Sequence, residues 1–392
     1  QFLYVIVSLM KKDKPHQETK AHRFAVLIAA RNEETVINHL IDSINTQTYD
    51  QGEVTVFVVA DNCTDQTAAC ARKMGAIVYE RFDQTKIGKG HAMEFLLNQM
   101  EKDYAPFDGY FVFDADNVLD QNYILEMNKT FSDGYDIITS YRNSKNYGDN
   151  WISSGYAIWF LWESEFLNRG RMLLGTSCAV SGTGFFFSRR IIEKYGGWKF
   201  FLLTEDIQFT VDNVLSGEKI GYCRQAMLYD EQPVKFQQSF RQRMRWAKGF
   251  FQVFHRYGLD LFKGSLQRNT SCYDMLMVIM PAIILTLFTL IFNGSMILFG
   301  DYTTYQDDLI MMMMGRMILN MYFMLVFIAT VTTATQWKNI HTTSFKKLAY
   351  IFTFPFFMFT YIPITIVAFF KKVEWQPIEH SRAKTLAEIK EG

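Results

Sequence analysis

The chain has 392 residues, which is long enough for a large catalytic or binding domain together with a membrane region. Lys and Arg number 40, as do Asp and Glu, so the formal net charge is zero and gives no electrostatic reason to expect a nucleic-acid partner. The five cysteines have no spacing typical of a metal site, which favours a reduced, cytosolic setting for the polar part of the chain.

The amino-terminal end of the chain is apolar. Residues 1–10 have the sequence QFLYVIVSLM, which is shorter than the roughly 20 residues that cross a bilayer as a helix. We therefore interpret residues 1–22 as the remnant of a transmembrane helix followed by a linker.

Residues 23–237 are predicted to form one α/β domain. Short apolar runs alternate there with stretches of helical periodicity, and this alternation predicts a mostly parallel sheet with right-handed crossovers. The runs span residues 24–30, 54–60, 76–79 and 110–113. The first run, FAVLIAA, is apolar throughout, as expected of a strand that is buried on both faces.

Polar residues follow several of these predicted strands. Ligands of such sheets bind beyond the carboxyl ends of the strands, so these positions are candidate binding residues. They are Asn32 and Glu33 after the first strand, Asp61 after the second, and Asp114 and Asp116 after the fourth.

Asp114 and Asp116 are candidate metal ligands. Mg²⁺ is usually held by one or two carboxylates together with phosphate oxygens, and a metal in that position offsets the charge of a diphosphate. Because Asp-x-Asp also arises by chance, a solvated loop is the alternative interpretation of these two residues.

Two further features near the strand ends suit a nucleotide. Asp61 is placed to accept hydrogen bonds from a base or a ribose, or else to cap the helix that follows. The segment 86–90, Lys-Ile-Gly-Lys-Gly, precedes a predicted helix. The lysines and the helix amino terminus both suit phosphates, and a plain turn is the alternative.

Thr204, Glu205 and Asp206 follow an apolar stretch. A carboxylate within hydrogen-bond reach of a hydroxyl group can act as a general base, and Asp206 is the candidate for that role. The alternative is a helix amino terminus, with Thr204 as its cap and the two acids favoured by the helix dipole.

Residues 238–270 are predicted to form an amphipathic helix at a membrane interface. Within it, Gln242, Arg245 and Trp246 form a Gln-x-x-Arg-Trp motif, in which Arg245 suits an anionic ligand and Trp246 a stacking one. Upstream, a glycine-rich stretch permits close backbone approach to a bound molecule, with a tight turn as the alternative. It consists of Gly182, Thr183 and Gly184.

Residues 271–372 are the predicted membrane region, and residues 373–392 are a tail. Three uncharged apolar stretches, 275–299, 317–336 and 348–370, are each long enough to cross a hydrocarbon core. The loop 300–308 is acidic and the segment 338–347 carries three lysines. The positive-inside rule therefore places the α/β domain in the cytoplasm of a multi-pass plasma-membrane protein that contacts lipids.

The third apolar stretch contains Pro355 and Pro363. If it crossed the membrane, the basic residues after it would lie outside, against the positive-inside rule. The prolines therefore leave open a bent or re-entrant element in place of a third crossing.

In their order and spacing, the motifs resemble those of the processive family 2 glycosyltransferases, such as cellulose, hyaluronan, chitin-oligosaccharide and poly-N-acetylglucosamine synthases. The resemblance covers roughly residues 24–260. It rests on Ala-Arg-Asn-Glu at 30–33, Asp61, Lys86 with Gly88, Asp-Ala-Asp, Gly-Thr-Gly, Thr-Glu-Asp and Gln-x-x-Arg-Trp. It implies a GT-A fold, a UDP-sugar donor and Mg²⁺ or Mn²⁺ as cofactor.

The resemblance also assigns roles to residues. Asp206, with Thr204 and Glu205, would form the catalytic group, and Asp114 and Asp116 would bind the metal. The residues that would contact the donor are Ala30, Asn32, Glu33, Asp61, Lys86, Asp114, Gln242 and Arg245. The residues that would contact the acceptor are Gly182, Thr183, Gly184 and Trp246.

The reaction expected from the resemblance is an inverting polymerisation of a β-linked polysaccharide, with the growing chain as acceptor and export through the membrane helices. Asp-Ala-Asp and Ser-Gly-Thr-Gly look nearer to β-glucan and poly-N-acetylglucosamine synthases than to hyaluronan synthases. UDP-glucose is therefore the favoured donor and UDP-N-acetylglucosamine the second. The apolar stretches are fewer than in cellulose synthases, so export by this chain alone and the need for accessory subunits stay open.

Two alternatives stay open, and the second belongs to another functional class. Ceramide glucosyltransferases resemble the chain in their Asp motifs and an x-x-Arg-Trp motif, so a single transfer to a lipid is the first. The second is a scaffold or transport subunit with an inactive domain, which would have lost key carboxylates. All of those carboxylates are present in this sequence.

Overall fold

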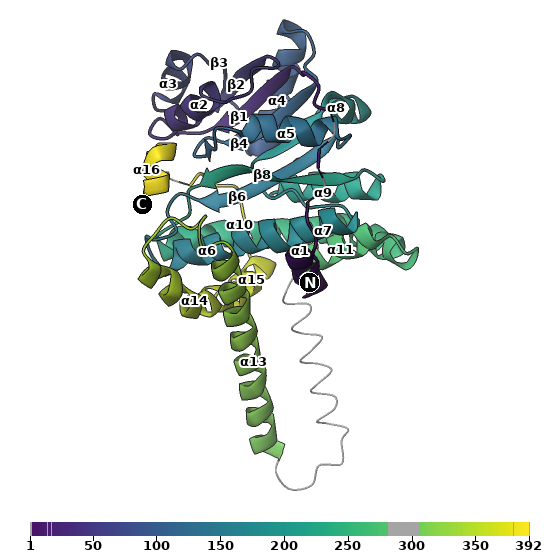
Figure 1. Cartoon of the computed structure of the whole chain (residues 1–392), viewed down its shortest axis with the longest axis vertical. Helices are drawn as coiled ribbons and strands as arrows, with labels where there is room; N and C mark the ends of the chain where they lie inside the picture. The colour runs from purple at the N-terminus through teal and green to yellow at the C-terminus, as the bar shows by residue number, and fades with distance from the viewer. Residues whose placement is uncertain (1, 14, 17, 281–305, 379, 392) are drawn as a thin grey trace.

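The computed structural model describes residues 2–13, 15–16, 18–280, 306–378 and 380–391. Within them, one eight-stranded mixed sheet has the strand order β3-β2-β1-β4-β7-β6-β8-β5 (Figure 1). The strands are β1 Phe24–Ala30, β2 Val54–Asp61, β3 Ile77–Arg81, β4 Gly109–Asp114, β5 Val118–Leu119, β6 Ile137–Ser144, β7 Phe185–Ser188 and β8 Ile220–Asp230.

The first four strands form the parallel part of the sheet. β1 pairs in parallel with both β2 and β4, and β2 pairs in parallel with β3. In this register Ala30 lies beside Ala60, and Ala29 lies beside Asp114. The carboxyl ends of the three strands that precede the candidate residues therefore meet at one edge, and the predicted parallel α/β sheet is confirmed.

Helices cover both faces of this sheet, because β1 is apolar on both sides. Phe24, Val26 and Ile28 belong to one buried cluster, which includes residues of α2 (Ile37–Asn45) and α5 (Tyr123–Ser132). Ala25 and Leu27 belong to a second cluster, which includes residues of α4 (Lys89–Asp103) and α9 (Glu205–Leu215). The first face also carries α3 (Thr67–Lys73).

The second half of the domain adds strands and helices of mixed direction. β7 is antiparallel to β4 and β6, whereas β8 runs parallel to β6. The helices that accompany these strands are α6 (Trp151–Trp162), a π-helix (Glu163–Asn168), α7 (Arg169–Leu174) and α8 (Arg189–Tyr195). The amino-terminal α1 (Phe2–Met10) packs against α7.

A long helix, α10 (Phe236–Leu266), runs beneath the domain in the view of Figure 1. Its predicted apolar face includes Met244 and Ala247, which pack on Ile364 and Ala368 of α15 (Tyr361–Phe370). Part of the apolar face of this amphipathic helix is therefore covered by α15. The periodicity of the helix alone does not predict this contact.

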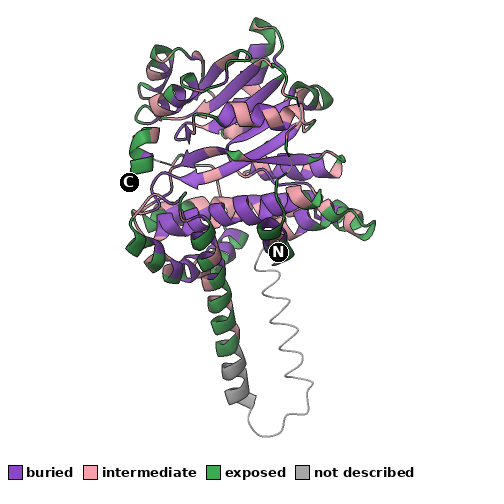
Figure 2. Cartoon of the chain, viewed as in Figure 1, coloured by how far each residue is buried: buried purple, intermediate pink, exposed green. Residues whose placement is uncertain are grey.

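Two segments of the described chain are long and apolar enough to cross a membrane. They are Gly315–Thr335, within α13 (Gln306–Thr335), and Ser344–Phe370, which comprises α14 (Ser344–Phe359) and α15. The predicted stretch 275–299 begins in α11 (Thr270–Ile279), but its residues from 281 onward lie outside the described part of the chain. In Figure 2, α13 projects away from the fold and its described residues are largely exposed.

The second of these segments is bent and packs along the domain. α14 ends at Phe359 and α15 begins at Tyr361, close to Pro355 and Pro363. At its start, Lys346 donates a hydrogen bond to the carbonyl oxygen of Gly148 at 2.7 Å. At its end, Lys248 donates to the carbonyl oxygen of Phe369 at 3.3 Å. Both ends of the segment therefore contact the α/β domain and its amphipathic helix.

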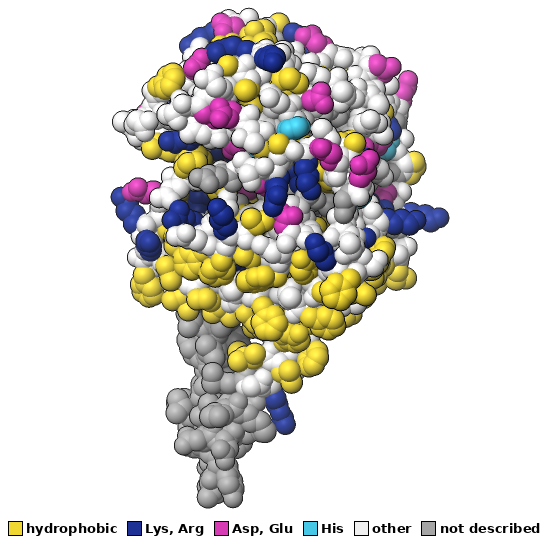
Figure 3. Space-filling model, turned by 90° about the vertical axis from the view of Figure 1, so that its left-hand side faces the viewer, with side chains coloured by type: hydrophobic (Ala, Val, Ile, Leu, Met, Phe, Trp, Pro, Cys, Tyr) yellow, Lys and Arg dark blue, Asp and Glu magenta, His cyan; other side chains and the backbone are white. Residues whose placement is uncertain are grey.

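Figure 3 shows a belt of hydrophobic side chains below the α/β domain, with Lys and Arg side chains gathered just above it. Exposed large apolar side chains occur on α1, on the end of α10, and on α14 and α15. They include Leu3, Phe262, Phe345, Phe352 and Phe370. Apolar patches of this kind are typical of membrane or protein contact surfaces.

A buried ion pair joins α7 to α11. The guanidinium of Arg171 and the carboxylate of Asp274 lie 2.7 Å apart, with side-chain exposures of 2% and 9%. We expect Asp274→Ala to lower the free energy of unfolding by about 3–5 kcal/mol, because Arg171 would keep its charge in a buried position without a partner. Thermal unfolding in detergent measures this effect.

The matched control is Asp260→Ala. Asp260 pairs with Lys263 on the surface of α10, with side-chain exposures of 60% and 71%, and an exposed pair contributes about 0–1 kcal/mol. Equal unfolding temperatures for the two variants would contradict a structural role for the Arg171–Asp274 pair.

Candidate functional site

The loops after β1 and β2 are built on two asparagines. Asn32 and Asn62 have φ angles of 58° and 54°, a left-handed conformation that Asn adopts more readily than most residues. The side-chain oxygen of Asn32 accepts a hydrogen bond from the amide of Thr64 at 2.8 Å. The two loops are thereby joined, and they hold the polar strand ends side by side.

Asp61 ends β2 and is buried. Its carboxylate pairs with the guanidinium of Arg81 at 2.5 Å, and Arg81 also donates to the carbonyl oxygen of Lys86 at 2.7 Å. The alternative of a helix cap is therefore wrong, because the carboxylate instead anchors the loop after β3. A nucleobase at this position would share the carboxylate with Arg81.

The two lysines of the glycine-spaced loop have different surroundings. Lys86 is exposed, whereas Lys89, in the first turn of α4, points into the site. The Lys89 ammonium group lies 2.5 Å from an oxygen of Asp114 and donates to the carbonyl oxygen of Gly182 at 2.9 Å. Lys89 therefore stands at the centre of the candidate site, and the nucleotide contact that the resemblance assigns to Lys86 stays a prediction.

The candidate base lies in the same network. An oxygen of Asp206 accepts a hydrogen bond from the amide of Gly182 at 2.5 Å. Gly182 has a φ angle of 74° and Gly184 one of 66°, which glycine adopts without strain. The glycine-rich turn thus links the carboxylate after β4 to the carboxylate at the start of α9.

Burial and charge act together on the carboxylates of α9. Burial, and then the charge of Asp206, raise the pKa of Glu205 to about 7, against the lowering effects of Lys89 and Arg245. Burial also raises the pKa of Asp206, although the amides of Ile207 and Gly182 oppose the change. A carboxylate with a raised pKa is a stronger base once it is ionised.

With Asp206 as the base, we expect kcat/KM to rise with pH along an acid limb that is displaced to higher pH, because a carboxylate that accepts a proton must first be ionised and burial raises the pKa of Asp206. A pH–rate profile of the free enzyme measures this dependence. Glu205→Gln should move the acid limb to lower pH, since it removes the neighbouring negative charge. A flat profile in both proteins would contradict this account.

Asp116 is buried beside β8. Its carboxylate accepts hydrogen bonds from the amide of Glu231 at 2.9 Å and from Asn117 at 3.4 Å. Asn117 in turn donates to Asp230 at 3.1 Å. Asp230, which is paired with Arg142, has its pKa raised to about 6 by burial, which outweighs the effect of Arg142.

Thr183 does not face open space. It is buried, and its hydroxyl group lies 2.5 Å from the side-chain oxygen of Asn117 and 2.9 Å from the amide of Asp114. Its side chain therefore supports the loop after β4.

The tail after α15 folds back over the same edge of the sheet. The imidazole of His380 lies 2.9 Å from the carboxylate of Glu33, and the amides of Ser381 and Arg382 donate to Glu231 at 3.0 and 2.9 Å. Burial lowers the pKa of His380, but Asp116, Glu33 and Glu231 outweigh it and raise the pKa to about 10. His380 is therefore a cation among these carboxylates.

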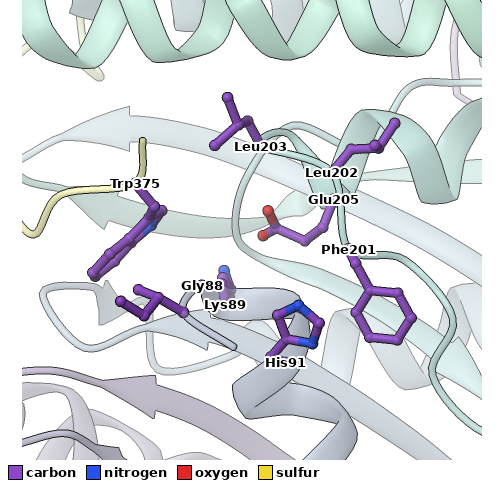
Figure 4. A pocket seen from close by; sticks show the side chains of 10 residues that line it. Gly88, Lys89, His91, Phe201, Leu202, Leu203, Glu205 and Trp375 are labelled. Atoms are coloured by element: carbon purple, nitrogen blue, oxygen red, sulfur yellow. The ribbon is translucent and has the colours of Figure 1, made fainter. Parts of the chain in front are cut away.

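Trp375 of the tail closes a small cavity of about 30 Å³ at the start of α4. Figure 4 shows Lys89 and Glu205 directed into this space, with Trp375 on its other side. Residues 373–392 were expected only to form a tail, and their sequence carries no motif that predicts these contacts. Neither Trp375 nor His380 could therefore be assigned to the site from the sequence.

Helix α10 approaches the site at Gly249, where a Cβ atom would lie 2.5 Å from the side chain of Thr204. This close packing sets Arg245 beside the loop before α9, and its guanidinium donates to the carbonyl oxygen of Leu203 at 3.1 Å. Trp246 packs edge-on against Tyr156 and Phe160, with ring centroids 5.7 and 6.2 Å apart. The side-chain oxygen of Gln242 is buried without a hydrogen-bond partner in the described structure.

Most of the predicted residues therefore share one edge of the sheet. Direct contacts join Asp114, Lys89, Gly182 and Asp206. Asp116 and Glu33 are linked indirectly, because the tail contacts Glu33 and also Glu231, whose amide donates to Asp116. Two predicted residues stand apart, because Lys86 is exposed and the side chain of Ala30 is buried in the core. Thr204 is the residue immediately before α9, and its side-chain oxygen makes no capping hydrogen bond to that helix.

No cluster of three or more His, Cys, Asp or Glu side chains that could hold a metal is found within the described ranges of the chain. The donor types nevertheless fit a divalent cation, since the carboxylates of Asp114 and Asp116 stand at the same edge. Oxygen donors of this kind suit Mg²⁺ and Mn²⁺.

The family model "Glycosyltransferase like family 2" matches residues 22–249, which is more than half of the chain. A probable glycosyltransferase of Bacillus subtilis, YdaM, is 25% identical over 279 residues, which cover 64% of this chain and 60% of the relative. A beta-monoglucosyldiacylglycerol synthase of Nostoc is 26% identical and covers 67% of this chain and 56% of that protein.

A poly-beta-1,6-N-acetyl-D-glucosamine synthase of Staphylococcus aureus is 23% identical, over 68% of this chain and 63% of that protein. The chain thus spans between 56% and 63% of the length of these three relatives. Among solved structures, the mannosyltransferase PcManGT of Pyrobaculum calidifontis, in complex with GDP-Man and Mn²⁺, is similar in fold. Its TM-score is 0.54 at 13% identity, over 94% of both chains.

Proposed function

The chain belongs to the family 2 glycosyltransferases, and from this premise we propose that it transfers a hexose from a UDP-sugar, with inversion at the sugar, to an acceptor at a membrane surface. The observation that carries the proposal is the contact of Asp114, Lys89, Gly182 and Asp206 in one network. It brings a candidate donor site and a candidate base together at the edge of the sheet where α/β folds bind ligands.

Each group in the network has a role in the proposed transfer. Asp206 takes the proton of the acceptor hydroxyl as the oxygen attacks the anomeric carbon, and the bond to the UDP oxygen breaks. Lys89 and Arg245 both act on the carboxylates of α9, and they would stabilise the charge that develops on the leaving diphosphate. The amide of Gly182 orients the carboxylate of Asp206 toward the acceptor.

A divalent cation would be held by Asp114 and Asp116. When bound, it would supply charge neutralisation of the diphosphate. The nucleotide would lie along Asn32, Glu33 and Asp61, with Gln242 reaching it from α10. Because Glu33 is paired with His380, the nucleotide and the tail would share this edge of the site.

We propose a β-linked polysaccharide as the product, with UDP-glucose as the favoured donor and UDP-N-acetylglucosamine as the second. The order of the motifs supports a polymerising enzyme, and the staphylococcal poly-N-acetylglucosamine synthase is among the relatives. The second candidate product is a glucosyl lipid. It is favoured by the exposed apolar side chains of α15 beside α10 and by the diacylglycerol-glucosylating relatives.

For the membrane we propose that α13 crosses the bilayer and that α14 and α15 lie in its interface. The support is the contact of both ends of Ser344–Phe370 with the domain and the contact of the following tail with Glu33. A crossing by that segment would separate the tail from Glu33. The catalytic domain, the amphipathic helix and the tail would then all lie in the cytoplasm.

The test is incorporation of radiolabelled UDP-glucose, in parallel with UDP-N-acetylglucosamine, by the purified chain in detergent with Mg²⁺ or Mn²⁺. Labelled polymer from one donor supports the polysaccharide product and identifies its sugar. Label that enters only added diacylglycerol supports the second candidate. Failure of both UDP-sugars to react, in a protein that still binds UDP, would overturn the proposed transfer.

We expect Trp246→Ala to reduce transfer to the acceptor by about tenfold more than it reduces hydrolysis of the donor. An aromatic ring that packs on a sugar contributes on the order of 1 kcal/mol, and hydrolysis does not use the acceptor sugar. The ratio of the two rates is the measurement. Phe250→Ala, one turn along α10, is the matched control, and equal losses of both rates would mean that Trp246 only anchors the helix.

A further inference from the structure

A second cavity lies outside the residues that the proposed transfer uses. It has a volume of about 130 Å³, which is room for several water molecules. Its walls come from three separated parts of the chain: the loop after β6, the start of α14 with the loop before it, and the tail. The residues that matter for its charge are Lys145, Asp149, His341, Lys346 and Lys384.

Lys145 is the most unusual of these residues. Its side chain is only 4% exposed, and its ammonium nitrogen has no hydrogen-bond partner in the described structure. Burial lowers the pKa of Lys145, and the carboxylates of Asp116, Glu231, Asp230 and Glu33 oppose that change. A buried ammonium group without a partner costs several kcal/mol in general, so an anion that pairs with it would be stabilising.

The other polar residues leave the cavity positive. Its one carboxylate, Asp149, is paired with Arg382 at 2.9 Å. Lys346 lines the cavity and donates to the carbonyl oxygen of Gly148 at 2.7 Å, which holds its charge in place. Burial, then Lys347 and Lys390, lower the pKa of His341, so the imidazole contributes neutral hydrogen-bonding atoms.

We propose that this cavity binds a phosphate group, which lies between Lys145, Lys346 and Lys384. Three lysines that line one small polar cavity match the charge and the acceptor oxygens of a phosphate. The bound group would connect the tail to the start of α14, because Lys384 and Lys346 belong to those two segments.

Two sources of phosphate are compatible with the position of the cavity. α14 begins beside it with the exposed apolar side chains of Phe345 and Leu348, and Figure 3 shows Lys and Arg side chains along the upper border of the hydrophobic belt. The phosphate of an anionic lipid headgroup would reach the cavity from that side. Soluble phosphate would reach it from the cytoplasm.

The site is distinct from the proposed donor site. None of the residues that line this cavity also lines the cavity at Lys89, Glu205 and Trp375. Lys145 is nevertheless close to the proposed donor site, since the charge of Asp116 acts to raise the pKa of Lys145. A competition measurement with UDP therefore belongs in the test.

The test titrates the full chain in detergent with inorganic phosphate by calorimetry, at fixed ionic strength and without divalent metal. We expect saturable binding that weakens at least tenfold in Lys145→Met and in Lys384→Gln. Lys263→Gln is the matched control, because Lys263 is exposed on α10, and it should bind as the wild type does. Lys145→Met should also unfold at the same or a higher temperature without phosphate, since it removes an unpaired buried charge.

A second arm uses nanodiscs of phosphatidylcholine with and without phosphatidylglycerol. Loss of phosphate binding only in the discs with phosphatidylglycerol identifies the lipid as the source, whereas equal binding in both identifies soluble phosphate. Full displacement of phosphate by UDP would overturn the proposal of a separate site. Absence of saturable binding, or equal binding by wild type and both cavity variants, would overturn it as well.

Discussion

Asp206→Asn is expected to reduce kcat by about 10³-fold or more, because a general base contributes roughly 10²- to 10⁴-fold and its loss acts on the chemical step. The substitution preserves the size of the side chain and an oxygen that can accept the 2.5 Å hydrogen bond from Gly182. UDP binding should stay close to that of the wild type, because the contact between Lys89 and Asp114 is unchanged. The measurements are steady-state kinetics and a UDP titration on the same preparation.

The matched control for this variant is Asp212→Asn. Asp212 lies on the same helix, α9, six residues further along. The same chemical change there should leave kcat within about twofold, because Asp212 lies outside the network of Asp114, Lys89, Gly182 and Asp206. A fully active Asp206→Asn would refute the assignment of the base. A parallel loss of UDP binding would instead mean that Asp206 shapes the donor site.

The sheet could be predicted because its first strands are apolar on both faces. Side chains of the run 24–30 belong to both buried clusters, one on each face of the sheet. A run that is apolar on both faces is typical of a central strand. The parallel pairings of β1, β2, β3 and β4 follow from the alternation with helices. The antiparallel β7 could not be derived in this way, because its position depends on contacts distant in the sequence.

Parts of the candidate site could be predicted because sheet geometry brings the strand ends together. Asp114 and Asp206 were selected from separate motifs, and the structure joins them through Lys89 and Gly182. The spacing of the two lysines in the loop does not show which of them, Lys86 or Lys89, enters the site. Which lysine points inward depends on where α4 begins, and α4 begins at Lys89.

The contribution of the tail could not be predicted from local sequence. His380 and Glu33 are 347 positions apart, and no period or motif connects them. The contact requires α14 and α15 to return the chain to the domain, which depends on the bend between the two helices at Thr360. For the same reason, the cavity at Lys145 arises only when the loop after β6, α14 and the tail are assembled.

Asp116→Asn is the second substitution with a large expected effect. It removes a charge from a buried position where the carboxylate accepts hydrogen bonds from the amide of Glu231 and from Asn117. The asparagine oxygen can still accept from Glu231, so the fold should persist. The negative charge that the proposed metal site requires is absent, and metal-dependent UDP binding should weaken by about 100-fold, or about 2.8 kcal/mol.

Calorimetric titration of UDP, with Mn²⁺ and again with a chelator, measures this effect apart from turnover. The wild type should bind UDP more tightly with the metal, and Asp116→Asn should bind it equally weakly in both conditions. Asp120→Asn is the matched control, because Asp120 lies four residues away and pairs with Lys390 at 2.8 Å. An Asp116→Asn protein that keeps the metal-dependent gain would remove Asp116 from the ligand set, whereas a wild type without that gain would argue that Lys89 and Arg245 alone offset the charge of the diphosphate.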